Sequence, residues 1–421
     1  MKVLWFEIST PSRYKDDGRV VCGWQDALED IMRGCHEIEL YIAFESTDSN
    51  AKVKVIDGIT YIPMVTHYSF AERKSSNWTW RVNEDKVITL GRKVIEEYQP
   101  DIIHVFGNEW PFGLLAQYTD IPLVIHIQGS IVPYNNALFP PTYSDFTVYR
   151  SLWPNPRKIF RRWKSRLKDE SRLDMEKRIW SSVRYYMGRT KWDYALSHIM
   201  RPDCSYFHVE EALRPSFLNG TKKWHCPDDG KLHLITTGIS SFWKGPDMLL
   251  KTAKILHDLG VNFEWKVAGN LNAEFKKVVE EHEKTTFEEN NVNILGFTQA
   301  DELCDILCNS SMMVHTAYIE NSPNAICEAQ CLGVPVVSTN VGGISTLVRD
   351  GIDGILIPAN DPWQMAYNII TLAKDKERMM QMSLSTREFA LRRHSTENIL
   401  SQLLSSYKSI VENSQRHKSH K

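Results

Sequence analysis

The sequence of 421 residues lacks the features that mark several classes of protein. It has no apolar run close to the roughly 18 residues that a membrane-spanning helix needs. Lys and Arg total 50 and Asp and Glu total 52, so the formal net charge of −2 shows none of the basic excess of dedicated nucleic-acid binders. With 42% hydrophobic and 24% charged residues, the composition is that of a globular protein and excludes disorder as the main state.

Cysteine is sparse and forms no redox motif. The chain has eight cysteines with no CxxC spacing, and it is too long to depend on a disulfide framework. Cys304, Cys308, Cys327 and Cys331 form two i,i+4 pairs, which leaves open a tetrathiolate metal site, although buried reduced thiols are the favoured interpretation. Residues 1–8 predict a first strand rather than a secretion signal, so we expect a cytoplasmic protein.

Short apolar runs alternate with amphipathic stretches along the chain. The sequence predicts strands at residues 2–6, 37–44, 61–65, 101–107, 122–129, 232–238, 263–269, 292–296, 312–316, 335–339 and 354–358. It predicts helices at 21–33 and 246–259 and a helical tail beyond about residue 375. Because continuous apolar strands separated by helices indicate a parallel sheet covered on both faces, we predict two doubly wound α/β domains, 1–220 and 221–395.

Residues 150–191 interrupt this alternation with a strongly basic, aromatic composition. They contain fourteen Lys or Arg against four Asp or Glu, a net of +10, which leaves −12 for the rest of the chain. On a helix, Phe160, Trp163 and Leu167 share one face among basic residues. Such a pattern indicates contact with an anionic membrane surface, or alternatively an ordinary helix whose apolar stripe packs on its own domain.

The most informative segment follows the predicted strand at 312–316. Glu320 and Glu328 lie on either side of a predicted helix start, where Ser322 is a suitable N-cap and Pro323 a suitable first helical residue. One carboxylate is therefore expected in a loop at the carboxyl end of a parallel strand, where such sheets bind ligands. The other is expected about two turns into the helix.

The predicted helix start is suited to an anion. The N–H groups of Asn324 and Ala325 point out of the first turn, and the helix dipole favours negative charge there, as in a diphosphate. Carboxylates bind vicinal hydroxyls through charge-assisted hydrogen bonds, so the two glutamates could hold a sugar and a ribose. The alternative is that both glutamates have no binding role.

Glycine-bearing segments follow other strands of the same predicted sheet. Thr237-Gly238 ends one strand, and Lys244 at the opening of the next helix is a point charge suited to phosphate. Gly342-Gly343 follows another strand and permits close backbone approach. Near the N-terminus, Gly18 and Gly23 lie in a loop between the first strand and the first helix.

Together these segments resemble the GT4 class of retaining glycosyltransferases, which have the GT-B fold and are also called glycosyl transferases group 1. The resemblance rests on the pair Glu320 and Glu328 and on the Ala-x-x-x-Gly-x-Pro-Val-Val run at 329–337. It continues through Gly342-Gly343 and 350–356, and Lys244-Gly245 also matches. It covers nearly the whole second domain and is looser in the first.

The resemblance implies two Rossmann-like domains that face each other across a cleft, with a final helix, 396–421, that packs back on the first domain. The second domain would bind a nucleoside-diphosphate sugar and the first an acceptor. No metal or other cofactor is implied. The implied donor-binding residues are Gly23, Gly238, Lys244, Glu320, Ser322, Pro323, Asn324, Ala325 and Glu328. The implied catalytic residues are Glu320, Lys244, Gln128 and His126.

The sequence departs from the family pattern at several positions. The usual cationic partner of Lys244 falls on Ile239, so the phosphate clamp is incomplete unless another residue, such as Arg19, supplies the charge. The usual histidine of the first domain falls on Gln128, with His126 two residues earlier. His126 is expected either to reach the cleft or to be a buried structural residue.

The predicted function is retaining transfer of a sugar to a hydroxyl of a glycan or a lipid-linked acceptor, in surface polysaccharide or glycoconjugate biosynthesis. The leaving phosphate would take the acceptor proton, while the protein positions the reactants and stabilises charge. Alternatives are another GT-B chemistry, such as a nucleotide-sugar epimerase, and an inactive nucleotide- or glycan-binding module. Expected partners are the nucleotide-sugar, the acceptor and the inner face of an anionic membrane, with no nucleic acid.

Overall fold

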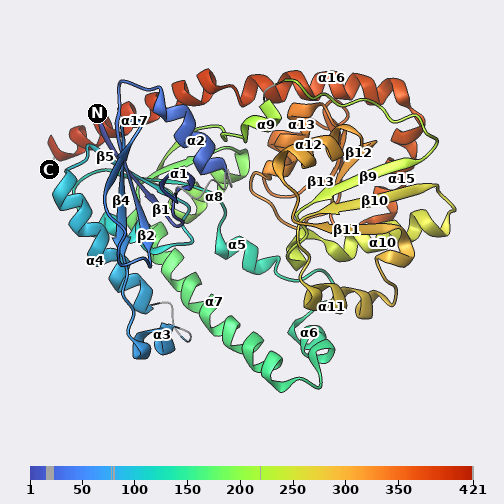
Figure 1. Ribbon diagram of the computed structural model, residues 1–421, viewed down its shortest axis with the longest axis horizontal. Coiled ribbons are helices and arrows are strands. Elements are labelled where there is room, and N and C mark those ends of the chain that lie inside the picture. Colours follow the sequence, from blue (N-terminus) through green and yellow to red (C-terminus); the bar gives the residue numbers. More distant parts are fainter. Residues whose placement is uncertain (16–22, 77, 79–80, 219, 420–421) are drawn as a thin grey trace. The chain divides into compact units, whose positions relative to one another are not determined.

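The computed structural model describes residues 1–15, 23–76, 78, 81–218 and 220–419. The chain divides into two compact units (Figure 1). The first unit comprises Met1–Pro133, Phe160–Ala212 and Ser395–Lys421, and the second comprises Tyr134–Ile159 and Leu213–His394. This division differs from the predicted one, because residues 134–159 belong to the second unit and the later crossing between units lies at 212/213 rather than near 220.

The first unit is built on an eight-stranded sheet in the order β3-β4-β2-β1-β5-β6-β7-β8. All neighbouring strands are parallel except the antiparallel pair β3 and β4. The strands are β1 Lys2–Glu7, β2 Glu39–Ser46, β3 Lys54–Ile56, β4 Ile59–Val65, β5 Ile102–Phe106, β6 Leu123–His126, β7 Tyr185–Gly188 and β8 Ser205–His208. The helices are α1 Ser12–Lys15, α2 Trp24–Arg33, α3 Phe70–Ser76, α4 Arg81–Tyr98, η1 Pro111–Gln117, α8 Lys191–Met200 and α17 Thr396–Ser419.

The second unit is built on a six-stranded parallel sheet in the order β11-β10-β9-β12-β13-β14. The strands are β9 Leu232–Thr237, β10 Phe263–Ala268, β11 Val292–Gly296, β12 Met312–His315, β13 Val336–Thr339 and β14 Gly354–Ile357. The helices are α6 Asp145–Leu152, α9 Pro215–Leu218, η2 Phe242–Lys244, α10 Pro246–Asp258, α11 Ala273–Glu283, η3 Glu288–Asn290, α12 Ala300–Cys308, α13 Asn324–Leu332, α14 Ile344–Leu347, α15 Pro362–Lys374 and α16 Lys376–Arg393. Two more helices, α5 Ile131–Asn136 and α7 Pro156–Ser182, cross the division between the units.

Both sheets are covered on both faces, as the continuous apolar strands predict. In β1, Leu4 packs into one hydrophobic cluster and Trp5 into another, because successive side chains of a strand point to opposite faces. In β9, Leu234 joins a cluster with α10, α11 and α15, and Ile235 joins a cluster with α12 and α13. The predicted doubly wound α/β class is confirmed.

The basic segment, which the sequence predicts to be helical, contains a long helix and also a strand that the sequence did not predict. Helix α7 has 27 residues, and its last part is core, since Met175, Ile179 and Trp180 are buried. Strand β7 follows it and adds to the sheet beside β6, and β8 pairs with β7. The sequence analysis missed this strand because its short apolar run, 185–187, directly follows a highly charged helix.

A buried polar contact joins helix α17 to strands β1 and β5 of the first unit. The Trp5 Nε1–H donates to the Tyr407 hydroxyl at 2.9 Å, and that hydroxyl lies 2.6 Å from the His104 Nδ1. Burial lowers the pKa of His104 to about 3, so the ring is neutral at pH 7 and its Nδ1 can accept a hydrogen bond from the Tyr407 hydroxyl. All three side chains are fully buried.

The seven cysteines in the described part of the chain are free thiols, and Cys22 lies outside it. Cys304, Cys308, Cys327 and Cys331 all pack into one apolar cluster of the second unit. Among the described residues no group of three or more His, Cys, Asp or Glu side chains is arranged to hold a metal ion. Across the same residues, no helix combines the length and hydropathy needed to cross a bilayer.

We expect Tyr407→Phe to lower the free energy of unfolding by about 2 kcal/mol, because it leaves the Trp5 N–H buried without an acceptor. Chemical denaturation followed by circular dichroism measures the change. Tyr118→Phe is the control, because Tyr118 is 49% exposed in the same unit. Equal stability of the two variants would contradict this account of α17.

Candidate functional site

The loop between β12 and α13 follows the predicted arrangement with a shift of one residue. Helix α13 begins at Asn324, and Pro323 is its N-cap, where Ser322 was predicted to cap and Pro323 to be helical. The Pro323 carbonyl already accepts the first hydrogen bonds of the helix, and Ser322 lies half-buried before it. Gly333 ends the helix with a φ of 84°, as predicted.

Glu320 lies enclosed in this loop beside two basic side chains. It is 4% exposed, the Lys244 ammonium donates to its Oε1, and the His315 Nε2 lies 3.4 Å from the same oxygen. Burial alone would raise the pKa of Glu320, but Lys244 and His315 together lower it to about 2. The carboxylate is therefore ionised at neutral pH although it is buried.

Two glycines allow the backbone to pack tightly around this ion pair. A Cβ on Gly342 would lie 1.8 Å from the Glu320 carbonyl oxygen, and a Cβ on Gly245 would lie 2.0 Å from the Thr316 carbonyl oxygen. Both glycines have positive φ values, 53° and 73°. The predicted close approach at Gly342 is confirmed, and Gly245 holds the turn that carries Lys244 against the end of β12.

Glu328 lies one turn into α13 and is paired with an arginine that the sequence did not single out. The Arg214 Nε and Nη2 donate to its two carboxylate oxygens, each at 2.7 Å. Glu328 is 5% exposed. Burial raises the pKa of Glu328, and the pairing with Arg214 acts against that rise.

Lys244, Arg214 and Glu328 line one cavity of about 380 Å³ at the carboxyl edge of the second sheet. The cavity is lined by Arg214, Thr237, Gly238, Ser240, Lys244, Leu303, His315, Pro323, Asn324, Ala325 and Glu328. The structure thus brings six of the predicted donor-binding residues to one place. Glu320 does not line the cavity, but it pairs with Lys244, which does. Ser322 precedes the N-cap of α13 and is not part of the lining either.

The charge around this cavity suits an anionic ligand with hydroxyl groups. Lys244 and Arg214 bring two cations, and the start of α13 adds the positive end of its helix dipole. The carboxylate of Glu328 supplies acceptors for hydroxyl groups. Gly238 has a φ of 73° and open space where a Cβ would lie, so this part of the lining stays unfilled.

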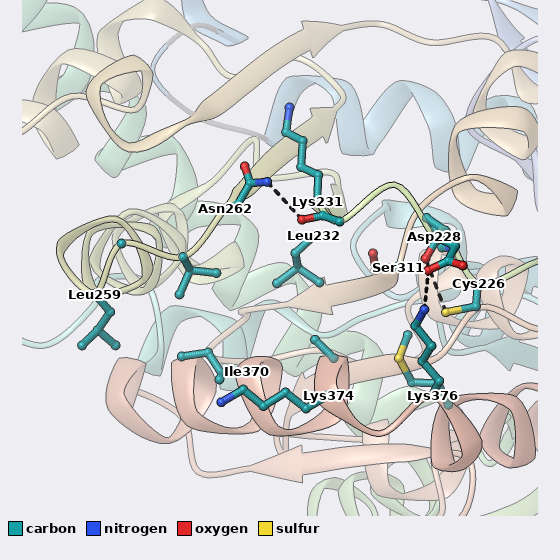
Figure 2. Close-up of a pocket in the computed structure, with 16 residues that line it drawn as sticks. Cys226, Asp228, Lys231, Leu232, Leu259, Asn262, Ser311, Ile370, Lys374 and Lys376 are labelled. Atoms are coloured by element: carbon teal, nitrogen blue, oxygen red, sulfur yellow. Dashed lines mark hydrogen bonds and ion pairs between the residues drawn. The ribbon is translucent and has the colours of Figure 1, made fainter.

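A second, larger cavity of about 550 Å³ lies at the opposite edge of the same sheet (Figure 2). It is lined at the amino ends of β9 and β12, by Leu232 and Ser311, and by Lys374 and Lys376 where α15 meets α16. Lys376 forms an ion pair with Asp228 across its rim. Because parallel sheets bind ligands at their carboxyl edge, we assign the candidate site to the smaller cavity.

The predicted catalytic residues of the first unit have different surroundings. His126 is fully buried, and its ring stacks near His104 at a centroid distance of 5.4 Å. Burial lowers the pKa of His126 well below its ordinary value. Of the two outcomes expected for His126, the structure shows burial, and its catalytic role stays a prediction. Gln128 is half-buried, beside the backbone of Gly107.

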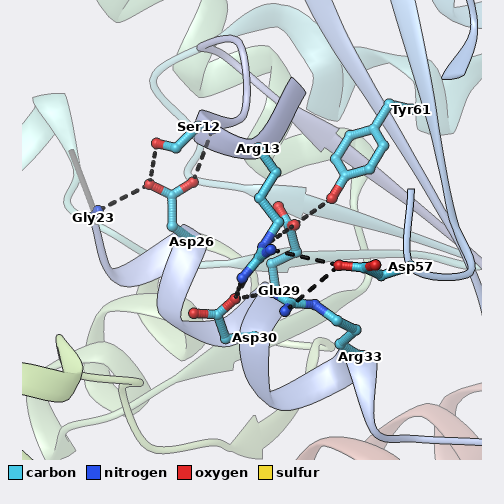
Figure 3. Close-up of polar contacts among 9 residues, drawn as sticks. All are labelled: Ser12, Arg13, Gly23, Asp26, Glu29, Asp30, Arg33, Asp57 and Tyr61. Atoms are coloured by element: carbon cyan, nitrogen blue, oxygen red, sulfur yellow. Dashed lines mark hydrogen bonds and ion pairs between the residues drawn. The ribbon is translucent and has the colours of Figure 1, made fainter. Parts of the chain in front are cut away.

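Gly23, predicted to bind the donor, is the N-cap of α2 in the first unit (Figure 3). Its N–H donates to Asp26 Oδ2 at 3.1 Å, and the same carboxylate accepts from the Ser12 hydroxyl at 2.7 Å. Among the described residues nothing lies within 4 Å of a Cβ placed on Gly23. Gly18 and Arg19, which the sequence analysis also named, lie outside the described residues.

The residues that sequence reasoning missed are Arg214 and His315. His315 is the last residue of β12, so its position at the strand end was an available signal. Arg214 is 114 residues from its partner, and no local pattern marks it. Ile239, the position of the usual cation, is an uncharged side chain that is 1% exposed and packs in the core, so it supplies no second charge near Lys244.

The sequence is similar to those of known glycosyltransferases. Residues 223–389 match the family model described as Glycosyl transferases group 1. The chain is 28% identical over 164 residues to a D-inositol 3-phosphate glycosyltransferase of Pseudarthrobacter chlorophenolicus, covering 37% of this chain and 38% of that protein. It is 26% identical over 152 residues to the amylovoran biosynthesis glycosyltransferase AmsK of Erwinia amylovora, covering 34% and 36%. The chain thus spans little more than a third of these relatives.

Solved structures share the fold over nearly the whole chain. The sucrose-phosphate synthase of Thermosynechococcus elongatus superposes with a TM-score of 0.70 at 15% identity, covering 98% of this chain and 99% of that one. HepE of Anabaena, solved in complex with UDP-glucose, superposes with a TM-score of 0.63 at 16% identity, covering 97% and 100%. The predicted GT-B fold class is confirmed.

We expect Lys244→Met to lower the free energy of unfolding by about 3 kcal/mol at pH 7, because it leaves the buried Glu320 carboxylate without its cation. The wild-type carboxylate stabilises the fold above its ordinary pKa of 4.5, and this contribution is lost as the pH falls toward 2. The difference between the proteins should therefore shrink over that range.

Urea unfolding at pH 7 and at acidic pH measures this difference. The matched control is Lys254→Met, which removes an exposed ion pair with Asp258 and should change stability by less than about 0.5 kcal/mol. Equal effects of the two substitutions at pH 7 would show that the Lys244–Glu320 pair does not stabilise the loop.

Proposed function

We propose that this chain, whose residues 223–389 match the model of the glycosyl transferases group 1 family, transfers a sugar from a nucleoside-diphosphate sugar to an acceptor hydroxyl. The observation that carries the proposal is the convergence of Lys244, Glu328 and the start of α13 on one cavity. A cation and a helix start suit a diphosphate, and a buried carboxylate suits ribose hydroxyls.

In this proposal each side chain has a defined task. Glu328 accepts hydrogen bonds from the ribose hydroxyls. Glu320 and the backbone of 322–324 bind the sugar that is transferred. Lys244 and the N–H groups of α13 stabilise the charge that develops on the leaving diphosphate, without a metal ion. Glu320 holds the Lys244 ammonium in place for that task.

We propose that transfer proceeds with retention of the anomeric configuration. The bond between the anomeric carbon and the diphosphate oxygen breaks, and a bond to the acceptor oxygen forms on the same face of the sugar. The acceptor proton passes to the leaving phosphate. The protein then contributes mainly positioning and charge stabilisation, which is why the cations around the cavity matter more than a general base.

A thermal-shift screen of UDP, GDP, ADP and CMP tests the donor site. One nucleoside diphosphate should stabilise the protein by about 2.7 kcal/mol at a hundredfold excess over its Kd. Glu328→Ala should weaken that binding about tenfold or more, because it removes charge-assisted hydrogen bonds. Glu302→Ala, an exposed residue of α12, is the matched control. Absence of any nucleotide effect, or an unchanged affinity in Glu328→Ala, would refute the proposal.

Nucleotide release separates the remaining alternatives. A transferase should release nucleoside diphosphate from its sugar donor faster when an acceptor is present. An epimerase would convert the donor without an acceptor, and a binding module would release none. Release that is insensitive to every acceptor hydroxyl tested would favour the alternatives over transfer.

An exposed aromatic cluster on the first unit bears on the acceptor. Trp78, Phe160 and Trp163 are 39%, 51% and 46% exposed, and their ring centroids lie 5.7 to 6.1 Å apart. The Lys164 ammonium lies 4.7 Å from the Trp78 ring centroid. The neighbouring positions of α7 are basic, namely Arg161, Arg162, Arg166 and Lys168.

This combination supports contact with an anionic lipid surface. Aromatic rings suit the boundary between headgroups and acyl chains, and each basic residue near such a surface contributes roughly 1 kcal/mol. The packed part of α7 keeps the cluster on a fixed support. We therefore propose a lipid-linked acceptor, as expected for surface polysaccharide or glycoconjugate assembly, with the protein bound peripherally to the inner face of the membrane.

Vesicle sedimentation tests this contact. The protein should sediment with phosphatidylcholine vesicles that contain 30% phosphatidylglycerol and stay in solution with phosphatidylcholine alone. The double variant Phe160→Ser and Trp163→Ser should bind at least about threefold less, because it removes most of the aromatic surface. Phe146→Ser, at a site 73% exposed in the other unit, is the control. Equal binding to both vesicle types would contradict the proposed contact with an anionic membrane.

A further inference from the structure

Arg214 forms the most sharply defined charge contact of the candidate site. It precedes α9, and its Nε and Nη2 donate to Glu328 Oε1 and Oε2, each at 2.7 Å. This is the side-on bidentate geometry in which a planar guanidinium matches both oxygens of a carboxylate. A single contact would leave the carboxylate free to rotate, whereas two fix its plane.

The guanidinium is itself held from a second side. Its central carbon lies 4.7 Å from the centroid of the Phe217 ring, and Phe217 is 1% exposed in the core of the second unit. The side chain of Arg214 is 24% exposed, so it is neither a free surface group nor a fully buried one. An aromatic ring on one side and a carboxylate on its edge restrict the guanidinium to one orientation.

The pair leaves part of the carboxylate available to a ligand. An ionised carboxylate has about four lone-pair sites, and Arg214 occupies one on each oxygen. Both residues line the same cavity as Lys244 and Asn324. The remaining acceptor sites of Glu328 are therefore presented in a fixed plane, in a site that already contains a cation and a helix start.

We propose that Arg214 is a positioning residue that fixes the Glu328 carboxylate for two ribose hydroxyls, and so makes the site selective for ribonucleotides over 2′-deoxyribonucleotides. This inference rests on the proposed function, because it takes Glu328 as the ribose ligand. Arg214 acts through Glu328 and need not touch the nucleotide. Lysine could neutralise the same carboxylate but could not fix its plane with two parallel hydrogen bonds.

The test compares one nucleoside diphosphate with its 2′-deoxy counterpart by isothermal titration calorimetry. The nucleotide is whichever of UDP, GDP or ADP gives the largest thermal shift. Wild-type protein should bind the ribonucleotide at least about tenfold more tightly, as expected for a hydrogen bond to a charged group. Arg214→Met should reduce this ratio to below about threefold, and Arg214→Lys should give an intermediate ratio.

The matched control is Arg349→Met, which removes another bidentate pair of the same unit, that with Asp353. Arg349 does not line the cavity, so the ratio should stay at its wild-type value. If Arg214→Met does not fold, Arg214→Lys and Arg214→Gln report the same ratio. Using a ratio within each variant separates a loss of positioning from a general loss of stability.

Each outcome has a distinct meaning. If wild-type protein binds none of the nucleotides, the proposed function fails before the role of Arg214 is reached. If wild-type protein shows the preference and Arg214→Met retains it, the positioning role is wrong. If Arg214→Met weakens both nucleotides equally, Arg214 acts on the phosphates or on the cavity as a whole, which also overturns the inference.

Discussion

A carboxylate enclosed at the edge of a sheet needs a cation beside it, and this constraint organises the second unit around Glu320. The residue is 4% exposed, yet Lys244 and His315 lower its pKa to about 2 against the effect of burial. The ion pair joins the turn before α10 to the loop after β12. Gly342 then lets the backbone after β13 pack directly on the Glu320 carbonyl. The charge pair thus joins two loops at the carboxyl edge, the loop after β13 packs on the backbone of Glu320, and Lys244 also lines the cavity.

The same edge carries a second charge pair with a different consequence. Glu320 keeps its charge through a lysine and a histidine, whereas Glu328 keeps its orientation through a bidentate arginine. A lysine is a point charge that leaves its partner free to rotate, and an arginine is a planar fork that does not. The proposed tasks follow this difference, since charge on a leaving diphosphate needs a nearby cation and two vicinal hydroxyls need an oriented acceptor.

The candidate site was largely predictable because its signals are local. A strand, a loop, Pro323 and a helix ended by Gly333 occupy one continuous segment, and each residue type has a short-range reason to be there. The helix start differed by one residue, since Pro323 caps α13 instead of entering it. The alternation of apolar strands and helices likewise predicted both parallel sheets, because a strand buried on both faces consists of a continuous run of apolar residues.

What the sequence did not predict depends on distance or on competing signals. Arg214 meets Glu328 across 114 residues, and no local pattern can indicate such a pair. Strand β7 follows 27 residues of highly charged helix, whose composition masked it. Residues 134–159, which end within the first turn of α7, join the second unit, and only tertiary packing decides this. The sequence left open whether His126 is buried, and packing decides it, since the ring is fully buried beside Trp24 and His104.

The most direct test of the central claim is a crystal structure with a bound nucleoside-diphosphate sugar. We predict the diphosphate at the first turn of α13, within hydrogen-bond distance of its backbone N–H groups and of Lys244, with the ribose hydroxyls on Glu328. A diphosphate bound instead in the cavity at the amino edge of the same sheet, or a ribose turned away from Glu328, would contradict the account.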